Sequence, residues 1–258
     1  MENSLFDISQ YEKTKPKKIN RRNFDFDFIY TDSTDIGLCC IAIQSGLKYG
    51  LQSGFNGCSR VGKYRGRHDV LFVDCNYRKY DHEKHLASVK EFEPKYATVR
   101  DIMNKQQCKE ADIEYFSFNQ IMNYAWELNK YAENVILIPK IDVIDKIPAE
   151  FMLGYSIPTS HGGTTIPIER FADHKTHLLG GSWKKQLNYI ERYNYVVSCD
   201  NNYIHLVSRY GNFCYPNGEI GRLKDIGLNP PSQLHVCTVI SFGSVAEKLF
   251  EIFGENNA

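Results

Sequence analysis

The sequence lacks an excess of charge of either sign. Its 258 residues carry 31 Lys and Arg against 31 Asp and Glu, so the formal net charge is zero. This balance excludes a protein coated with basic groups for general nucleic-acid binding. Any polyanion would have to meet local basic patches.

The sequence also lacks long apolar runs and paired cysteines. No run approaches the roughly 18 residues that span a bilayer, so we expect no membrane association. The eight cysteines include no C-x-x-C pair and no zinc-site spacing, and we find no secretory signal. We therefore expect reduced thiols, a cytoplasmic location (the host cytoplasm for a phage protein) and no metal or other cofactor.

Two basic segments are candidates for contacts with a polyanion. One is an N-terminal arm over residues 1–23, and the other is a glycine-rich loop over residues 54–69. The candidate nucleic-acid-binding residues are Lys17, Lys18, Arg21 and Arg22 in the arm, and Arg60, Lys63, Arg65 and Arg67 in the loop. Cations on flexible backbone suit phosphate contacts. The alternative is that both segments are simply solvated.

From residue 24 to residue 258 the pattern alternates between strands and helices. The predicted strands cover residues 24–30, 70–75, 96–100, 113–117, 134–139, 151–157, 176–179 and 195–199. The predicted helices are one capped by residues 33–35 and running to about 49, followed by 82–92, 104–110, 118–131, 183–193 and 241–253. This order predicts an α/β fold, a (β/α)8 TIM-type barrel, for which about 250 residues suffice. An insertion over about 203–240 precedes the last helix.

Three predicted strands each deliver an aspartate into the following loop, namely Asp74, Asp101 and Asp200. A carboxylate just past a buried strand is costly without a partner or a task, and barrels place catalytic groups there. Because their two strands are both expected to flank the first strand, Asp74 and Asp200 form a candidate pair for glycosyl chemistry. One would attack the sugar and the other would move a proton. The alternative is that either one is a strand-end cap or an ion-pair partner.

Other positions suit the recognition of a flat base. The Asp101 carboxylate accepts two N–H donors from a guanine-type edge, a pairing that adenine does not offer. Alternatively, Asp101 forms a local pair with Arg100. Gly180 and Gly181 allow the backbone to approach a flat ligand, and so does Gly154 within its strand. For these glycines the alternatives are a tight turn and barrel packing.

Five short motifs, taken in order, resemble the tRNA-guanine transglycosylase superfamily. They are FVDCNY (72–77), TVRD (98–101), FMLGY (151–155), HLLGGS (177–182) and VVSCDNN (196–202). The closer likeness is to the DNA-modifying branch, which exchanges guanine in DNA for a 7-deazaguanine base. It covers roughly residues 24–210.

The resemblance implies a (β/α)8 barrel and a role for each matching position. Asp200 matches the nucleophile that attacks C1′ of the sugar, and Asp74 matches the general acid/base. Asp101 matches the carboxylate that reads the guanine edge, and Tyr77 is a stacking partner for the base. The remaining expected substrate-binding residues are Gly154, Gly180, Gly181 and Asn201.

The sequence departs from the tRNA enzymes at one point. They carry a cysteine-rich zinc subdomain after the nucleophile, and Cys214 and Cys237 are too sparse to replace it. We therefore predict a base-exchanging glycosyltransferase whose partners are DNA and a 7-deazaguanine base such as the 7-cyano form, acting as a homodimer, with a partner subunit or alone. The alternatives are a transglycosylase or hydrolase acting on RNA or free nucleosides, and a non-catalytic nucleic-acid-binding accessory protein.

Overall fold

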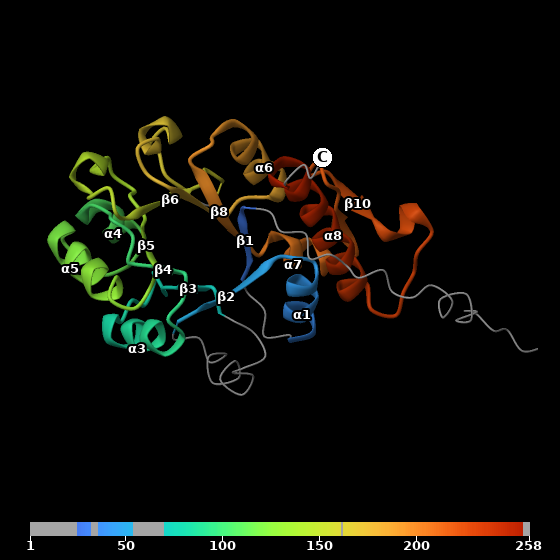
Figure 1. Cartoon of the computed structure of the whole chain (residues 1–258), viewed down its shortest axis with the longest axis horizontal. Coiled ribbons are helices and arrows are strands. Elements are labelled where there is room, and N and C mark those ends of the chain that lie inside the picture. The colour runs from blue at the N-terminus through green and yellow to red at the C-terminus, as the bar shows by residue number, and fades with distance from the viewer. Residues whose placement is uncertain (1–24, 32–35, 54–69, 161, 255–258) are drawn as a thin grey trace, which may run out of the picture.

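Eight parallel strands close into a barrel in the computed structural model of the protein, which confirms the predicted (β/α)8 architecture (Figure 1). The structure describes residues 25–31, 36–53, 70–160 and 162–254. Each barrel strand pairs with the next along the chain, and β8 pairs with β1 to close the ring. The strands are β1 (Asp27–Tyr30), β2 (Lys48–Gln52), β3 (Phe72–Asp74), β4 (Tyr96–Thr98), β5 (Asn134–Leu137), β6 (Met152–Ser156), β7 (Thr176–Leu179) and β8 (Val196–Asn201).

Helices follow most of the strands and lie outside the ring (Figure 1). They are α1 (Ile36–Gln44), α3 (His82–Phe92), α4 (Lys105–Glu110), α5 (Phe118–Leu128), α6 (Trp183–Arg192), α7 (Tyr203–Ser208) and α8 (Gln233–Phe253). The 3-10 turns η2 (Ile144–Lys146) and η3 (Ile168–Phe171) take the helix positions after β5 and β6, and η4 (Leu223–Ile226) follows an antiparallel hairpin of β9 (Asn212–Cys214) and β10 (Ile220–Arg222). None of the helices in these ranges combines the length and apolarity that a membrane span requires.

Local sequence accounts for the start and the buried face of α5. Ser117 and Gln120 form a reciprocal capping box that fixes the start of α5. Ile121, Ala125 and Leu128 follow at three- and four-residue spacing and are all buried. The helix therefore packs one apolar face onto the barrel, as its pattern predicts.

One predicted strand is wrong and one strand was missed, so their number is right. The predicted helix ran to about residue 49, but α1 ends at Gln44 and Gly46, with φ of 89°, turns the chain into β2 (Lys48–Gln52). Residues 113–117 were expected to be a strand, but they form an irregular connection. There the amide of Ile113 donates to the Cys108 carbonyl and the Glu114 carbonyl accepts from Arg100.

The corrected strand order changes the position of Asp74. It lies on β3, which β2 separates from β1, so its strand does not flank β1 as expected. Asp200 lies on β8, which does flank β1. The two aspartates are therefore three steps apart around the ring, at the same end of it.

The predicted insertion is shorter than expected because the last helix begins earlier. α8 starts at Gln233, two residues after Pro231, rather than at residue 241. α7 and the β9–β10 hairpin pack against it, beside α1, at one side of the barrel (Figure 1). Phe213, Leu223 and Cys237 form a small core of their own there.

The barrel encloses an apolar core distinct from the larger core beneath the helices. It is formed by Ile29, Phe72, Tyr96, Ile136, Ile138 and Met152. Gly154 lies among these side chains, since a Cβ there would be 2.8 Å from Ile138 Cγ1 and 2.7 Å from Leu179 Cδ1. Gly154 thus allows close packing of side chains from neighbouring strands, which is the barrel-packing alternative and not the approach of a ligand.

Replacing Gly154 by alanine is expected to lower the free energy of unfolding by about 1–3 kcal/mol, the usual cost of overpacking a core. The measurement is urea unfolding of both proteins. Gly243→Ala is the control, because a Cβ on this exposed face of α8 meets no atom within 4 Å and alanine is the better helix former. An equal loss at both positions would contradict the packing argument.

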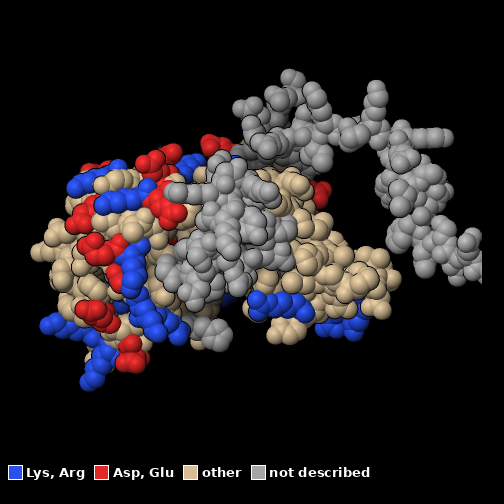
Figure 2. Space-filling model, turned by 90° about the horizontal axis from the view of Figure 1, so that it is seen from below, with Lys and Arg blue, Asp and Glu red and all other residues tan. Residues whose placement is uncertain are grey.

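The described surface mixes charges of both signs. On the face shown in Figure 2, Lys and Arg side chains alternate with Asp and Glu side chains, in keeping with the zero formal charge of the chain. The basic arm and the 54–69 loop, with all eight candidate nucleic-acid-binding residues, lie outside the described residues.

Candidate active site

Five of the predicted site residues line one pocket at the mouth of the barrel. Because the eight strands are parallel, their carboxyl ends open at the same end of the ring. The pocket has a volume of about 460 Å³, enough for a purine-sized ring system. Its wall includes Asp74, Tyr77, Asp101, Gly180 and Gly181, together with Lys140, which the sequence analysis did not assign.

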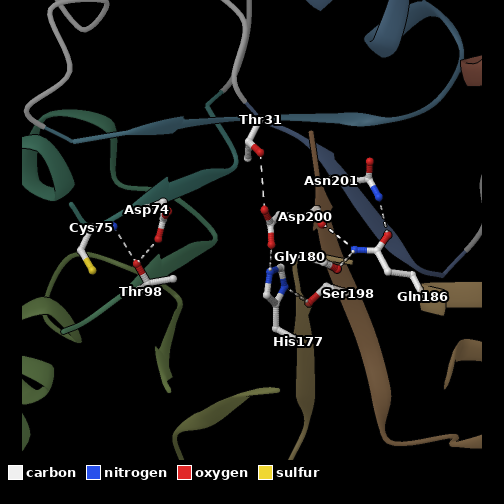
Figure 3. Close-up of polar contacts among 10 residues, drawn as sticks. All are labelled: Thr31, Asp74, Cys75, Thr98, His177, Gly180, Gln186, Ser198, Asp200 and Asn201. Atoms are coloured by element: carbon white, nitrogen blue, oxygen red, sulfur yellow. Dashed lines mark hydrogen bonds and ion pairs between the residues drawn. The ribbon is translucent and has the colours of Figure 1, made fainter. Parts of the chain in front are cut away.

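Asp74 is the carboxylate most perturbed by its surroundings. Thr98 Oγ1 donates to its Oδ1 at 2.7 Å and also accepts from the amide of Cys75 at 2.7 Å (Figure 3). Burial raises the pKa of Asp74 to about 7, against the Thr98 hydrogen bond, which lowers it. The negative charges of Asp200 and Asp101 raise it further. Asp74 can therefore both give and take a proton near neutral pH.

Asp101 faces a buried cation across the pocket wall. Its Oδ2 lies 3.6 Å from Lys140 Nζ, and both side chains are about 13–14% exposed. Burial raises the pKa of Asp101 and lowers that of Lys140, while the attraction between the two charges acts in the opposite sense on each. Arg100 instead directs Nη2 to the Glu114 carbonyl at 3.1 Å. The direct ion pair of Asp101 is thus with Lys140 and not with Arg100, the alternative partner considered from the sequence, although the charge of Arg100 still lowers the pKa of Asp101.

Asp200 lies beside the pocket rather than in its wall. Its Oδ2 accepts from Thr31 Oγ1 at 3.4 Å, and its Oδ1 lies 3.4 Å from His177 Nε2 (Figure 3). His177 is fully buried, and its Nδ1 is 2.8 Å from Ser198 Oγ. The charge of Asp200 acts on Asp74 strongly enough to raise its pKa, so the two carboxylates belong to one electrostatic site.

The glycine turn after β7 is tied to the end of β8 by Gln186 of α6. Gln186 Nε2 donates to the carbonyls of Gly180 at 3.0 Å and Asp200 at 2.7 Å. Gly180 and Gly181 have φ of 68° and 81°, a conformation that favours glycine. The turn is therefore fixed both by residue type and by its hydrogen bonds.

Asn201 and Gly154 are placed away from the pocket wall. Asn201 is 1% exposed, donates through Nδ2 to Gln186 Oε1 at 2.8 Å and accepts the amide of Ile204 on Oδ1 at 3.2 Å. Its amide thus supports the strand end, where the sequence analysis expected a substrate contact. Gly154 lies in the barrel core described above.

Four residues at this site were missed by sequence reasoning, namely Thr98, Lys140, His177 and Gln186. A polar side chain within a short apolar strand, as for His177 in THLL, is a signal that was present. That the His177 side chain points into the barrel could be known only from the strand register. Within the described ranges, no three His, Cys, Asp or Glu side chains are grouped so as to hold a metal ion.

Comparison with solved structures shows a likeness in fold. The structure of the YdjI aldolase from Escherichia coli K12 superposes with a TM-score of 0.52, at 11% sequence identity, over 92% of this chain and 94% of the aldolase. A search among curated proteins finds no match. The family comparison matches residues 42–225, which include β2 to β8 and all three aspartates, to a family of unknown function. The family description states no activity, so the resemblance to the transglycosylases stays a prediction, and by its sequence the chain belongs to the family DUF6610.

Proposed function

We propose that the protein is a transglycosylase that exchanges guanine in DNA for a 7-deazaguanine base. The observation that carries the proposal is the electrostatic coupling of three carboxylates at one barrel mouth. Asp74 and Asp101 line the same pocket, and the charges of Asp101 and Asp200 both raise the pKa of Asp74. Two carboxylates in different environments suit a double displacement at a sugar carbon.

In the first half-reaction, Asp200 Oδ2 attacks C1′ of a deoxyguanosine in the strand. The C1′–N9 bond breaks, and its electron pair leaves with the base. Asp74 in its acid form gives a proton to the departing guanine. A covalent ester between Asp200 and the sugar is left. In duplex DNA the nucleotide must first be flipped out of the base stack, which costs a few kcal/mol.

In the second half-reaction, Asp74 works as a base. Its carboxylate removes the N9 proton of the incoming 7-deazaguanine, and N9 attacks C1′. The C1′–Oδ2 bond breaks and returns the electron pair to Asp200. Asp74 ends the cycle protonated as it began, and so the exchange balances without an energy source.

The pair of Asp101 and Lys140 supports a base with a carbonyl beside an N–H. An acceptor and a cationic donor stand 3.6 Å apart in the pocket wall. A guanine-type edge places its carbonyl against the ammonium and its N–H groups against the carboxylate. An adenine-type edge offers the carboxylate only one N–H group beside an unprotonated ring nitrogen, so one of the two donors to the buried charge is lost, which is costly.

The test is direct detection of exchange. The full chain is incubated with a guanine-containing DNA oligonucleotide, single-stranded or duplex, and 7-cyano-7-deazaguanine, and the digested nucleosides are analysed by mass spectrometry. We expect a modified deoxynucleoside together with free guanine in equal amount. Parallel reactions contain RNA of the same sequence or free deoxyguanosine.

The controls separate the proposal from its alternatives. If modified product forms from RNA or from the free nucleoside but not from DNA, then DNA is not the substrate. Salt-dependent DNA binding without base release would instead indicate a non-catalytic binding protein. Either result overturns the proposal.

A further inference from the structure

A chain of polar side chains runs through the otherwise apolar interior of the barrel. It leads from Asp200 through His177 and Ser198 toward Tyr96, whose hydroxyl donates to Asp27 Oδ2 at 2.8 Å. All but Asp200 are at most 9% exposed. Buried polar groups are costly unless each finds a partner, so the one weak contact in this chain is informative.

That contact joins His177 Nε2 to Asp200 Oδ1. Both atoms are buried, 3.4 Å apart, and neither has a well-aligned hydrogen-bond partner among the described residues. The outer oxygen, Oδ2, is turned toward Thr31. The two oxygens of Asp200 are thus unlike each other, because one faces a buried imidazole and the other faces a hydroxyl on the rim.

The protons of this arrangement follow from the acceptor character of a carboxylate. An ionised Asp200 only accepts, so the proton between the two residues must be on His177 Nε2. In a neutral imidazole, Nδ1 is then an acceptor and takes the hydroxyl proton of Ser198, 2.8 Å away. The Ser198 hydroxyl accommodates this tautomer because it can donate to Nδ1, while the Asp200 carboxylate, which has no proton to give, favours Nε2–H.

The ring of His177 is also held in orientation. It stacks on Phe72 with centroids 5.3 Å apart and an interplanar angle of 16°. Tyr96 lies on another side at 6.4 Å, and its own hydroxyl is anchored at Asp27, which Lys95 also contacts at 2.7 Å. Rotation of the imidazole would break the Ser198 bond and disturb this packing.

We propose that His177 is a positioning residue that holds the inner oxygen of Asp200 and leaves Oδ2 as the attacking atom. The inference rests on the proposed function. When Oδ2 bonds to C1′, Oδ1 becomes the ester carbonyl and still faces His177 Nε2, 3.4 Å away before the reaction. As the C1′–Oδ2 bond breaks, charge returns to the carboxylate, and the same donor stabilises it. His177 therefore assists the second half-reaction most.

The reaction test measures the two half-reactions separately. Mixing protein with DNA in the absence of an incoming base gives the rate of covalent adduct formation on denaturing gels. Adding 7-cyano-7-deazaguanine then gives the rate of adduct decay. His177→Phe retains an aromatic ring against Phe72 but has no donor, and its adduct decay is expected to slow by at least about tenfold more than its formation. His177→Gln restores an N–H near the Nε2 position and recovers part of the decay rate.

A second measurement does not depend on activity. In ¹⁵N-labelled protein, long-range imidazole correlations of His177, assigned with the Phe variant, are expected to show a protonated Nε2 and an unprotonated Nδ1. Asp200→Asn should shift the Nε2 resonance, and Ser198→Ala should shift Nδ1.

The outcomes separate this inference from the proposed function. A protonated Nδ1 overturns the positioning role, and so do equal losses in both half-reactions for the Phe and Gln variants with unchanged thermal unfolding. If the protein exchanges no base but His177 is protonated on Nε2, the contact between His177 and Asp200 is supported. The transglycosylase proposal is then overturned.

Discussion

Asp200→Asn is expected to abolish the covalent protein–DNA adduct and to slow base exchange by at least about 10³-fold, as removal of a nucleophile does in other double displacements. An amide oxygen is a poor nucleophile, while the size of the side chain is unchanged. Asparagine keeps one oxygen to face His177 Nε2, and its Nδ2 can donate to the Thr31 hydroxyl, which is able to accept as well as donate. The loss is therefore expected without unfolding, and the measurement is adduct formation on denaturing gels.

The matched control is Asn202→Ala, two residues along the chain. Asn202 is exposed at the start of α7 and its side chain makes no capping hydrogen bond. Wild-type exchange is expected for this variant. If Asp200→Asn, verified by mass to be free of deamidation, still exchanges labelled guanine at the wild-type rate, the assignment of the nucleophile is wrong.

The second large effect concerns Asp74 and pH. With a pKa of about 7, adduct formation needs the acid form and is expected to fall as pH rises above 7, while adduct decay needs the carboxylate and is expected to fall below 7. Asp74→Asn should remove both dependences and slow both steps by about 10²–10⁴-fold. Single-turnover rates between pH 5 and pH 9 test this. A wild-type profile flat across neutrality would contradict the role.

The same pKa has a consequence for folding that requires no substrate. The folded-state pKa of Asp74 is raised from 3.8 to about 7, so ionisation disfavours the native state. Its contribution to stability is full below about pH 4 and is lost as pH rises toward 7, by at most about 1.4 kcal/mol per pH unit. Asp74→Asn should therefore gain stability relative to wild type between pH 5 and pH 8, as measured by urea unfolding.

The fold was predictable because its main signals are local. β7 has the predicted bounds, as does α3, and α5 starts at the predicted residue, Phe118. The error at β2 has a physical origin, since KYGLQ follows an apolar helix and its glycine and lysine weaken any strand signal. Gly50 suits the interior instead, because a Cβ there would lie 2.8 Å from Phe72 Cδ1.

The site was predictable only in part. Asp74 and Asp200 lie at or near the carboxyl ends of β3 and β8, and Asp101 follows β4. The expected position of all three at strand ends suggested a shared mouth. The partners of these residues arise from strand register and helix packing, which a single sequence does not encode locally. Lys140 meets Asp101 only because β4 and β5 are neighbours.

Gln186 makes the proposed active site sensitive to a helix outside the barrel. One amide group joins the Gly180 turn to the backbone of Asp200, and its oxygen accepts from Asn201. A displacement of α6 that keeps both hydrogen bonds is therefore expected to move the Gly180 turn and the Asp200 backbone together. Substitutions that shift α6 are therefore expected to affect the Gly180 turn and Asp200 together rather than one of them alone.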